Sequence, residues 1–364
     1  MQLLRAIIII GFTFSFLIQN ATACGLETVA STSDTYNLVN PCTEATIDLT
    51  LPLTVKTFNF FSNKNLIGVI SNYDFSKFES GISLYLDNTG ITEIPQADHL
   101  PANIKILSTW YNTLNQAALK VYDFKKFTDP EFRLILSNTG ITEIPPLENL
   151  PATLYTLSVK ENTLDQAKLA LYDFRKFGSI TYGFSLVLEQ TGITHIPSVD
   201  KLPEFLNYFG LKNNPLDQTA FLAYNFSKFS RLLQLDLRNT GITNLPPADH
   251  FPANFIALYL DGNALNCMDC TTMTTLFAFK SSIIQYSGFS CTIPTFKPVC
   301  SIGGFYDATL TMPTTTSPTA PSTNTTAPSS NEISVGAIIG ISIGGFVIFS
   351  GMVYFIATRF FHRV

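Results

Sequence analysis

Residues 232–265 read LLQLDLRNTGITNLPPADHFPANFIALYLDGNAL, and this stretch decides the fold. From Leu232, and again from Phe255, the chain follows the pattern L-x-x-L-x-L-x-x-N/T-x-L, with Phe allowed at the first place and Ile at the last. The central L-x-L predicts a short strand whose alternate side chains point to one face. One unit cannot bury its apolar face alone, so the pattern predicts stacked units that share a continuous core.

The pattern extends through the middle of the chain. Nine units begin at Val55, Gly81, Ile104, Glu131, Leu154, Gly183, Leu206, Leu232 and Phe255. Long units of 26 to 29 residues alternate with short units of 23 residues. The ninth position of the units also alternates, as Asn63, Thr89, Asn112, Thr139, Asn162, Thr191, Asn214, Thr240 and Asn263. We expect these side chains to turn inward and hydrogen-bond the backbone, which is a structural role.

On these repeats, residues 55–265 resemble the extracellular leucine-rich-repeat family. The resemblance implies an α/β solenoid, a horseshoe with a parallel concave sheet and a mixed helical and extended convex side. It also implies that the concave sheet surface binds the partner.

The outer side should differ between the two kinds of unit. The segments 114–127, 164–177 and 216–229 of the long units lack internal proline, and we expect a helix in each. In the second segment, apolar residues fall at helical spacing: Leu164, Ala167, Leu171, Phe174 and Phe177. The recurring phrase Tyr-Asp-Phe-x-Lys-Phe is interpreted as the inward stripe of this helix rather than as a docking motif. Short units carry proline at both ends of the segment, which favours extended or 3₁₀ backbone.

Six cysteines flank the repeats, and an even number in an oxidising compartment favours disulfides. Cys24 and Cys42 precede the first unit and are expected to pair. The last four resemble the C-terminal cap of extracellular leucine-rich-repeat proteins, in which two bridges surround a short helix, here expected at 274–279. The resemblance suggests Cys267–Cys291 and Cys270–Cys300 among three pairings. It is partial, since two residues separate the first two cysteines instead of one and the usual Trp is missing. A zinc site is the alternative, because Cys-x-x-Cys can chelate a metal.

Both ends of the chain carry membrane signals. The start has the charge, apolar core and small residues of a signal peptide cleaved after Ala23, with an uncleaved anchor as the alternative. Residues 335–357 hold 23 residues without a charge and are followed by Arg359 and Arg363, which predicts a membrane helix with the N-terminal side outside. A lipid-anchor signal is the alternative.

The expected order is a signal peptide (1–23), an N-terminal cap (24–54), nine repeats (55–265), a cysteine-rich C-terminal cap (266–308), a Thr/Ser/Pro-rich stalk (309–332), a transmembrane helix (333–357) and a cytoplasmic tail (358–364). The expected location is the plasma membrane, with a single pass and an extracellular N-terminus. The tail of seven residues is too short for a signalling domain. The glycines Gly336, Gly340 and Gly344 form a stripe that suits a homo- or heterodimer in the membrane.

Positions three, five, seven and eight of each unit should point outward from the sheet. Aromatic and arginine side chains are enriched among binding hot spots. The candidate ligand-binding residues are Tyr85, Trp110, Tyr111, Arg133, Lys160, Tyr208, Lys212, Arg238 and Tyr259. Trp110 is the single Trp of the chain and is expected to face outward beside Tyr111. The charges along units five to eight are mixed, which suits a protein or peptide better than a polyanion.

A net charge of -5 with 13% charged residues gives no reason to expect nucleic acid. No catalytic, phosphate-binding or metal motif appears in the sequence, so we expect neither an enzyme nor a cofactor. Glycosylation sequons stand at Asn225 and Asn324, the first in a segment expected to be helical and therefore poorly suited to modification. The sequence favours a receptor-like protein that depends on a signalling partner. An adhesion or structural surface protein, or a shed decoy, is the alternative.

Overall fold

The computed structural model describes residues 26–28, 35–38, 53–64, 70, 72–78, 81–178, 181–232, 234–253, 255–284, 291, 298–301 and 304–306. The predicted signal peptide, membrane helix, tail and the Cys24–Cys42 pair lie outside these residues. Among the described residues, no helix has the length and apolar character needed to cross a bilayer.

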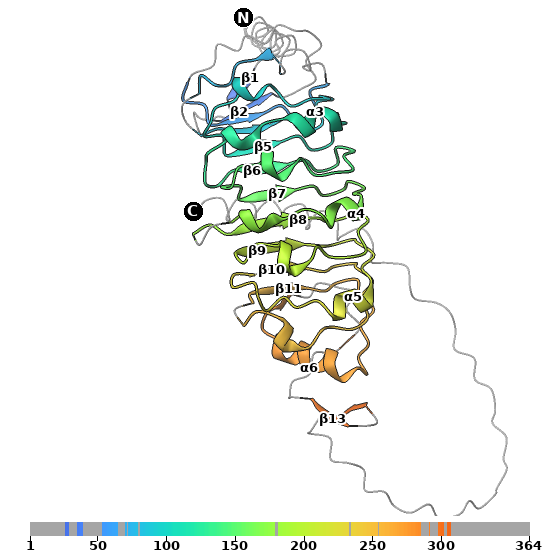
Figure 1. Ribbon diagram of the computed structural model, residues 1–364. Coiled ribbons are helices and arrows are strands. Elements are labelled where there is room, and N and C mark those ends of the chain that lie inside the picture. Colours follow the sequence, from blue (N-terminus) through green and yellow to red (C-terminus); the bar gives the residue numbers. More distant parts are fainter. Residues whose placement is uncertain are drawn as a thin grey trace, which may run out of the picture. The chain divides into compact units, whose positions relative to one another are not determined.

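Among the described residues, twelve strands form one sheet that runs through the repeats and into the segments on both sides, and its strands follow one another in chain order (Figure 1). Strands β1 and β2 pair antiparallel, and each later neighbour pairs parallel. The strands are β1 (Leu26–Thr28), β2 (Thr35–Leu38), β3 (Thr57–Asn59), β4 (Ser83–Tyr85), β5 (Ile106–Ser108), β6 (Arg133–Ile135), β7 (Thr156–Ser158), β8 (Phe184–Val187), β9 (Leu206–Gly210), β10 (Gln234–Asp236), β11 (Ala257–Tyr259) and β12 (Ile283–Ile284).

The pairing register agrees with the repeat pattern unit by unit. The third residues of the nine units lie opposite one another across β3–β11: Thr57, Ser83, Ile106, Arg133, Thr156, Ser185, Tyr208, Gln234 and Ala257. The fourth residue of every unit is fully buried. A slip of one residue would turn each buried side chain to solvent, so burial sets this register. The predicted α/β solenoid is confirmed for these strands.

The helices of the long units are shorter than the sequence suggested. They are α3 (Gln116–Val121), α4 (Gln166–Leu169) and α5 (Gln218–Leu222), and they lie on the side of the stack away from the sheet (Figure 1). In the first two, separate 3₁₀ turns follow: η3 (Phe124–Lys126) and η5 (Phe174–Lys176). The short units have the predicted 3₁₀ turns, at η2 (Ala97–His99), η4 (Leu147–Asn149), η6 (Val199–Lys201) and η7 (Ala248–His250).

The prediction of one helical stripe over 164–177 was therefore wrong in part. Phe174 and Phe177 are buried as expected, but the side chain of Leu171 is 76% exposed and Ala167 is exposed too. The physical reason is a second cap. Asp165 accepts hydrogen bonds at the start of α4, and Asp173 accepts one from the Arg175 N–H at the start of η5, so the chain changes direction between the two turns.

The ninth-position side chains form a buried ladder between neighbouring units. The Asn162 amide nitrogen donates to the carbonyls of Val159 and Leu136, each at 2.8 Å, and its oxygen accepts the Thr139 N–H at 2.9 Å. Asn214 and Asn263 bond in the same way to the short unit before them. Asn112 makes the same two donor contacts, and its oxygen accepts the Gly90 N–H at 2.7 Å. The inward, structural role predicted for these residues is confirmed.

The C-terminal cap continues the sheet. Helix α6 (Cys270–Ala278) begins earlier than predicted, β12 pairs with β11, and β13 (Val299–Ser301) pairs antiparallel with β14 (Gly304–Tyr306). The predicted Cys267–Cys291 bridge is present. Cys270 is also disulfide-bonded, while its pairing with Cys300 stays a prediction. Because both cysteines of the Cys-x-x-Cys pair are oxidised, neither offers a thiolate to zinc.

Candidate binding face

The open sheet face is the set of side chains at positions three, five, seven and eight of the units, which point away from the core. All nine predicted ligand-binding residues lie on it, and each is half-buried except Tyr111, which is exposed. Side chains of this kind are available to a partner, but their placement alone assigns them no ligand.

An aromatic cluster occupies the N-terminal part of the open sheet face. The rings of Trp110 and Tyr111 lie 4.5 Å apart between centroids with planes tilted by 31°. Tyr111 is 48% exposed and Phe61, two units earlier, is 51% exposed. Trp110 faces the open side as predicted but is half-buried, and its indole nitrogen is buried without a hydrogen-bond partner among the described residues.

The backbone beneath this cluster has left-handed geometry. The eighth residue of every unit has a positive φ: Ser62, Asn88, Tyr111, Asn138, Glu161, Gln190, Asn213, Asn239 and Gly262. Glycine and asparagine adopt this conformation readily, whereas a bulky side chain is uncommon there. Tyr111, at φ 57°, thus places an aromatic ring where the backbone favours Asn or Gly.

A buried carboxylate supports Trp110 from the neighbouring unit. Asp87 is 9% exposed, and one of its oxygens accepts the Trp110 N–H at 2.8 Å and the Ser108 hydroxyl at 2.5 Å. Burial raises the pKa of Asp87, and these two hydrogen bonds oppose the change. Burial and the nearby Asp87 carboxylate raise the pKa of Tyr85. The carboxylate therefore holds the backbone before Tyr111 in place.

Paired charges occupy the C-terminal part of the face. The Arg238 guanidinium donates to both oxygens of Asp236, a residue only 1% exposed, and lies 5.1 Å above the Tyr259 ring. The Tyr208 hydroxyl donates to Glu189 at 2.8 Å, and burial first, then the Glu189 charge, raises the pKa of Tyr208.

Gly210 makes the Tyr208 contact sterically feasible. A Cβ there would lie 2.9 Å from the Tyr208 ring and 3.0 Å from a Glu189 oxygen. This role of Gly210 is not among the sequence-based predictions, although a glycine within a strand is a signal of close approach.

The remaining predicted residues are Arg133 in unit four, Lys160 in unit five and Lys212 in unit seven. Arg133 is 5.0 Å above the ring of Tyr155, a contact that the outward-position rule did not foresee. Lys160 is 3.1 Å from Glu161, which also accepts from Asn138 at 3.2 Å. Lys212 is half-buried. The structure thus joins Trp110 to Tyr111 and Arg238 to Tyr259, and it shows no single cluster of all nine.

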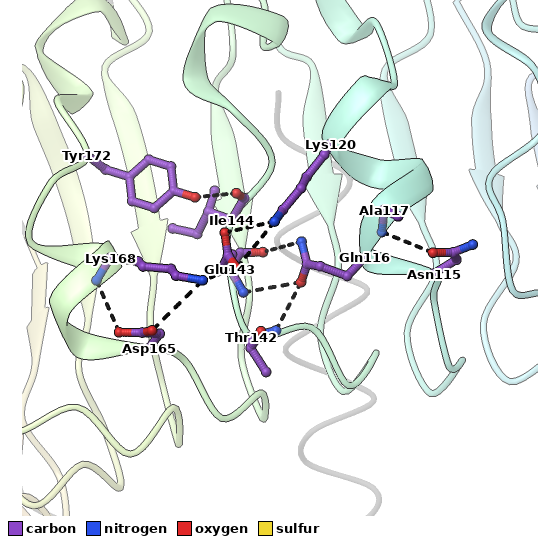
Figure 2. A network of polar contacts seen from close by, with 10 residues as sticks. All are labelled: Asn115, Gln116, Ala117, Lys120, Thr142, Glu143, Ile144, Asp165, Lys168 and Tyr172. Carbon is purple, nitrogen blue, oxygen red and sulfur yellow. Dashed lines mark hydrogen bonds and ion pairs between the residues drawn. The ribbon is translucent and has the colours of Figure 1, made fainter.

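The opposite, helix-bearing side carries a polar network that joins units three, four and five (Figure 2). The Gln116 side chain accepts the N–H groups of Thr142 and Glu143 and donates to the Glu143 carbonyl at 3.1 Å. The Glu143 carboxylate lies between Lys120 and Lys168, and the hydrogen bond from Lys168, with help from Lys120, lowers its pKa.

A hollow of about 570 Å³ adjoins this network, with Tyr172, Leu171 and Asp173 in its wall. The Tyr172 hydroxyl donates to the Ile144 carbonyl, and Tyr122 does the same to Pro95 at 2.7 Å. The Tyr-Asp-Phe-x-Lys-Phe phrase therefore connects units, which supports a structural role, but it follows the helix instead of forming its inward stripe. Within the described part of the chain, no group of three metal-binding side chains converges.

No protein-family model matches the sequence, and no curated protein matches it either. Among solved structures, a chain of the octameric complex of latrophilin 3 (Lec, Olf), Unc5D (Ig, Ig2, TSP1) and FLRT2 (LRR) is similar over 67% of this chain and 87% of that chain. The two share 20% sequence identity, with a TM-score of 0.41. A similarity at this level says nothing about function. The leucine-rich-repeat fold stands on the strand register and the Asn–Thr ladder.

Proposed function

We propose that this protein binds an extracellular protein or peptide through its open sheet face. The observation that carries the proposal is Tyr111. Its ring is 48% exposed and stacked beside Trp110, on a backbone conformation that costs a bulky residue free energy. Strained residues that the surrounding structure maintains are found preferentially at functional sites. A merely structural role would be filled better by Asn, as in units two, four, seven and eight.

The charges of the face favour a protein partner over a polyanion. Arg238 is neutralised by Asp236, and Lys160 lies beside Glu161. A polyanion needs a run of unpaired cations, whereas exposed aromatic rings next to paired charges are typical of protein interfaces.

The proposal extends to the cell surface. It rests there on the sequence alone, namely the predicted signal peptide at 1–23 and the membrane helix at 333–357. The proposal includes dependence on a signalling partner in the membrane, which the predicted glycine stripe at Gly336, Gly340 and Gly344 suits.

The test is binding of purified secreted and cell-surface proteins to eukaryotic cells that express the full chain. Trp110→Ala and Tyr111→Asn should each lower the affinity for a true partner about tenfold or more, which is the loss expected for a hot-spot residue. Leu171→Ala is the matched control, since it removes a side chain that is 76% exposed on the helix-bearing side. A partner that both aromatic variants bind as tightly as the wild type would refute recognition by the open sheet face.

A second comparison separates the receptor-like role from adhesion. Gly340→Leu would make the predicted glycine stripe bulky. Loss of a cellular response with retained ligand binding supports dependence on a membrane partner. An unchanged response supports the adhesion or structural alternative.

A further inference from the structure

One position of the long units is occupied by an acidic cap in three cases and by an asparagine in the fourth. Each side-chain oxygen accepts the N–H two residues further on, at 2.9 to 3.2 Å. The four residues are Asp74, Asp123, Asp173 and Asn225. Because the geometry is shared, the asparagine oxygen performs the capping task as well as a carboxylate does.

The exchange at Asn225 creates a sequon, since Ser227 stands two residues later. The apolar spacing predicts a helix at this sequon. In the structure α5 ends at Leu222, and Asn225 and Ser227 are both exposed while Phe226 between them is fully buried. The buried ring anchors the turn and directs the asparagine outward.

The amide nitrogen of Asn225 is available for modification. The oxygen is engaged with the Ser227 N–H at 2.9 Å, and the nitrogen has no hydrogen-bond partner among the described residues. The neighbouring tyrosine keeps the contact found in the other long units, since the Tyr224 hydroxyl donates to the Pro197 carbonyl at 2.9 Å. A substituent on the nitrogen therefore displaces no contact that joins the units.

We propose that Asn225 carries an N-linked glycan on the helix-bearing side of the solenoid. In the reaction, the Asn225 nitrogen bonds to the first sugar carbon of a lipid-linked oligosaccharide, the bond from that carbon to the lipid diphosphate breaks, and the amide loses one proton. The equivalent residues Asp123 and Asp173 line the hollows of the earlier units. The glycan thus covers the corresponding place in unit seven, next to α5, and leaves the open sheet face accessible. The inference rests on the proposed passage of the chain to the cell surface.

The experiment is peptide mass spectrometry of the full chain from glycosylating eukaryotic cells, with and without peptide N-glycosidase. The wild type should show a glycan mass on the peptide that contains Asn225, lost on enzyme treatment. Asn225→Asp is the matched variant, because it removes the acceptor and restores the capping residue of Asp173. Ser227→Ala should also lose the glycan, and Ser227→Thr should keep it. Partner binding by the open sheet face should be the same for Asn225→Asp and the wild type.

The predicted second sequon makes failure informative. A chain with sugar on Asn324 and none on Asn225 would overturn the inference while leaving the proposed cell-surface route intact. A chain with no sugar at either site would overturn it and count against that route as well. An Asn225→Asp chain that fails to reach the folded state would overturn the claimed equivalence with Asp173.

Discussion

Replacing Asn162 by Ala tests whether the buried ladder holds neighbouring units together. Asn162 is 3% exposed, and its side chain bonds to backbone groups of two units. The substitution leaves the Thr139 N–H and the Val159 carbonyl without the bonds that they make at 2.9 and 2.8 Å. The Leu136 carbonyl is less affected, because it also accepts the Thr139 hydroxyl at 2.7 Å.

The magnitude follows from the two groups that lose their partner. A buried donor or acceptor left unsatisfied costs about 1–3 kcal/mol, so the free energy of unfolding should fall by about 2–6 kcal/mol. This is a large share of the roughly 5–15 kcal/mol that stabilises a typical domain.

Urea unfolding followed by circular dichroism measures the change as a fall in the midpoint. Thr163→Ala is the control, since it alters the exposed neighbouring residue and should stay within about 0.5 kcal/mol of the wild type. A loss below about 1 kcal/mol for Asn162→Ala would show that water or a backbone shift replaces the ladder bonds, and the reasoning from unsatisfied groups would fail.

Three further predictions concern the open sheet face and the C-terminal cap. Gly210→Ala should displace the Tyr208 ring, since the new Cβ would lie 2.9 Å from it, and the phenol should then titrate at lower pH in an ultraviolet absorbance titration. An unchanged titration would show that the ring accommodates the methyl group. Burial raises the pKa of Asp87 in the folded state above its ordinary value of 3.8, so the folded protein binds this proton more tightly than the unfolded chain does. The stability that this protonation contributes is present at acidic pH and is lost as the pH rises from 3.8 through the folded pKa. Asp87→Asn cannot titrate, so its free energy of unfolding relative to the wild type should increase from acidic to neutral pH. A difference that stays constant with pH would contradict a raised pKa of Asp87. Removing the Cys267 bridge by a double Cys→Ala change opens a loop with a sequence separation of 24 residues, which should lower stability by roughly 3 kcal/mol in the same urea assay. No loss would mean that the cap is held by packing alone.

The register and the ladder could be predicted from the sequence because one physical requirement repeats nine times. Each fourth position must be buried, and each ninth position must satisfy the backbone where the strand ends. The sequence also shows the preference at the eighth position, since Asn recurs there in units two, four, seven and eight and Gly262 stands there in unit nine. Ser62, Tyr111, Glu161 and Gln190 depart from this preference, and Tyr111 is the one aromatic residue at the eighth position of the nine units.

Other features could not be predicted because they depend on competition between local signals. Apolar spacing over 164–177 favoured one helix, but the caps at Asp165 and Asp173 divide it and expose Leu171. The hydrogen bond from Tyr208 to Glu189 joins two neighbouring units, and it is possible only because Gly210 has no side chain. Such contacts follow from three-dimensional neighbours rather than from periodicity.

The two kinds of junction in the stack are joined by different polar devices. From a short unit to the long unit after it, the side-chain amide of Asn112, Asn162, Asn214 or Asn263 reaches back to the earlier backbone. From a long unit to the short unit after it, the side chain of Gln116, Gln166 or Gln218 holds the next loop by its N–H and carbonyl groups.

A duplication or loss of one unit would place two long units or two short units side by side, and the Asn or Gln contacts described above would then lack their partner groups. A duplication or loss of a pair, in steps of 49 to 52 residues, preserves both devices. The unit of duplication or loss is therefore the pair, and the open sheet face is expected to grow or shrink two strands at a time.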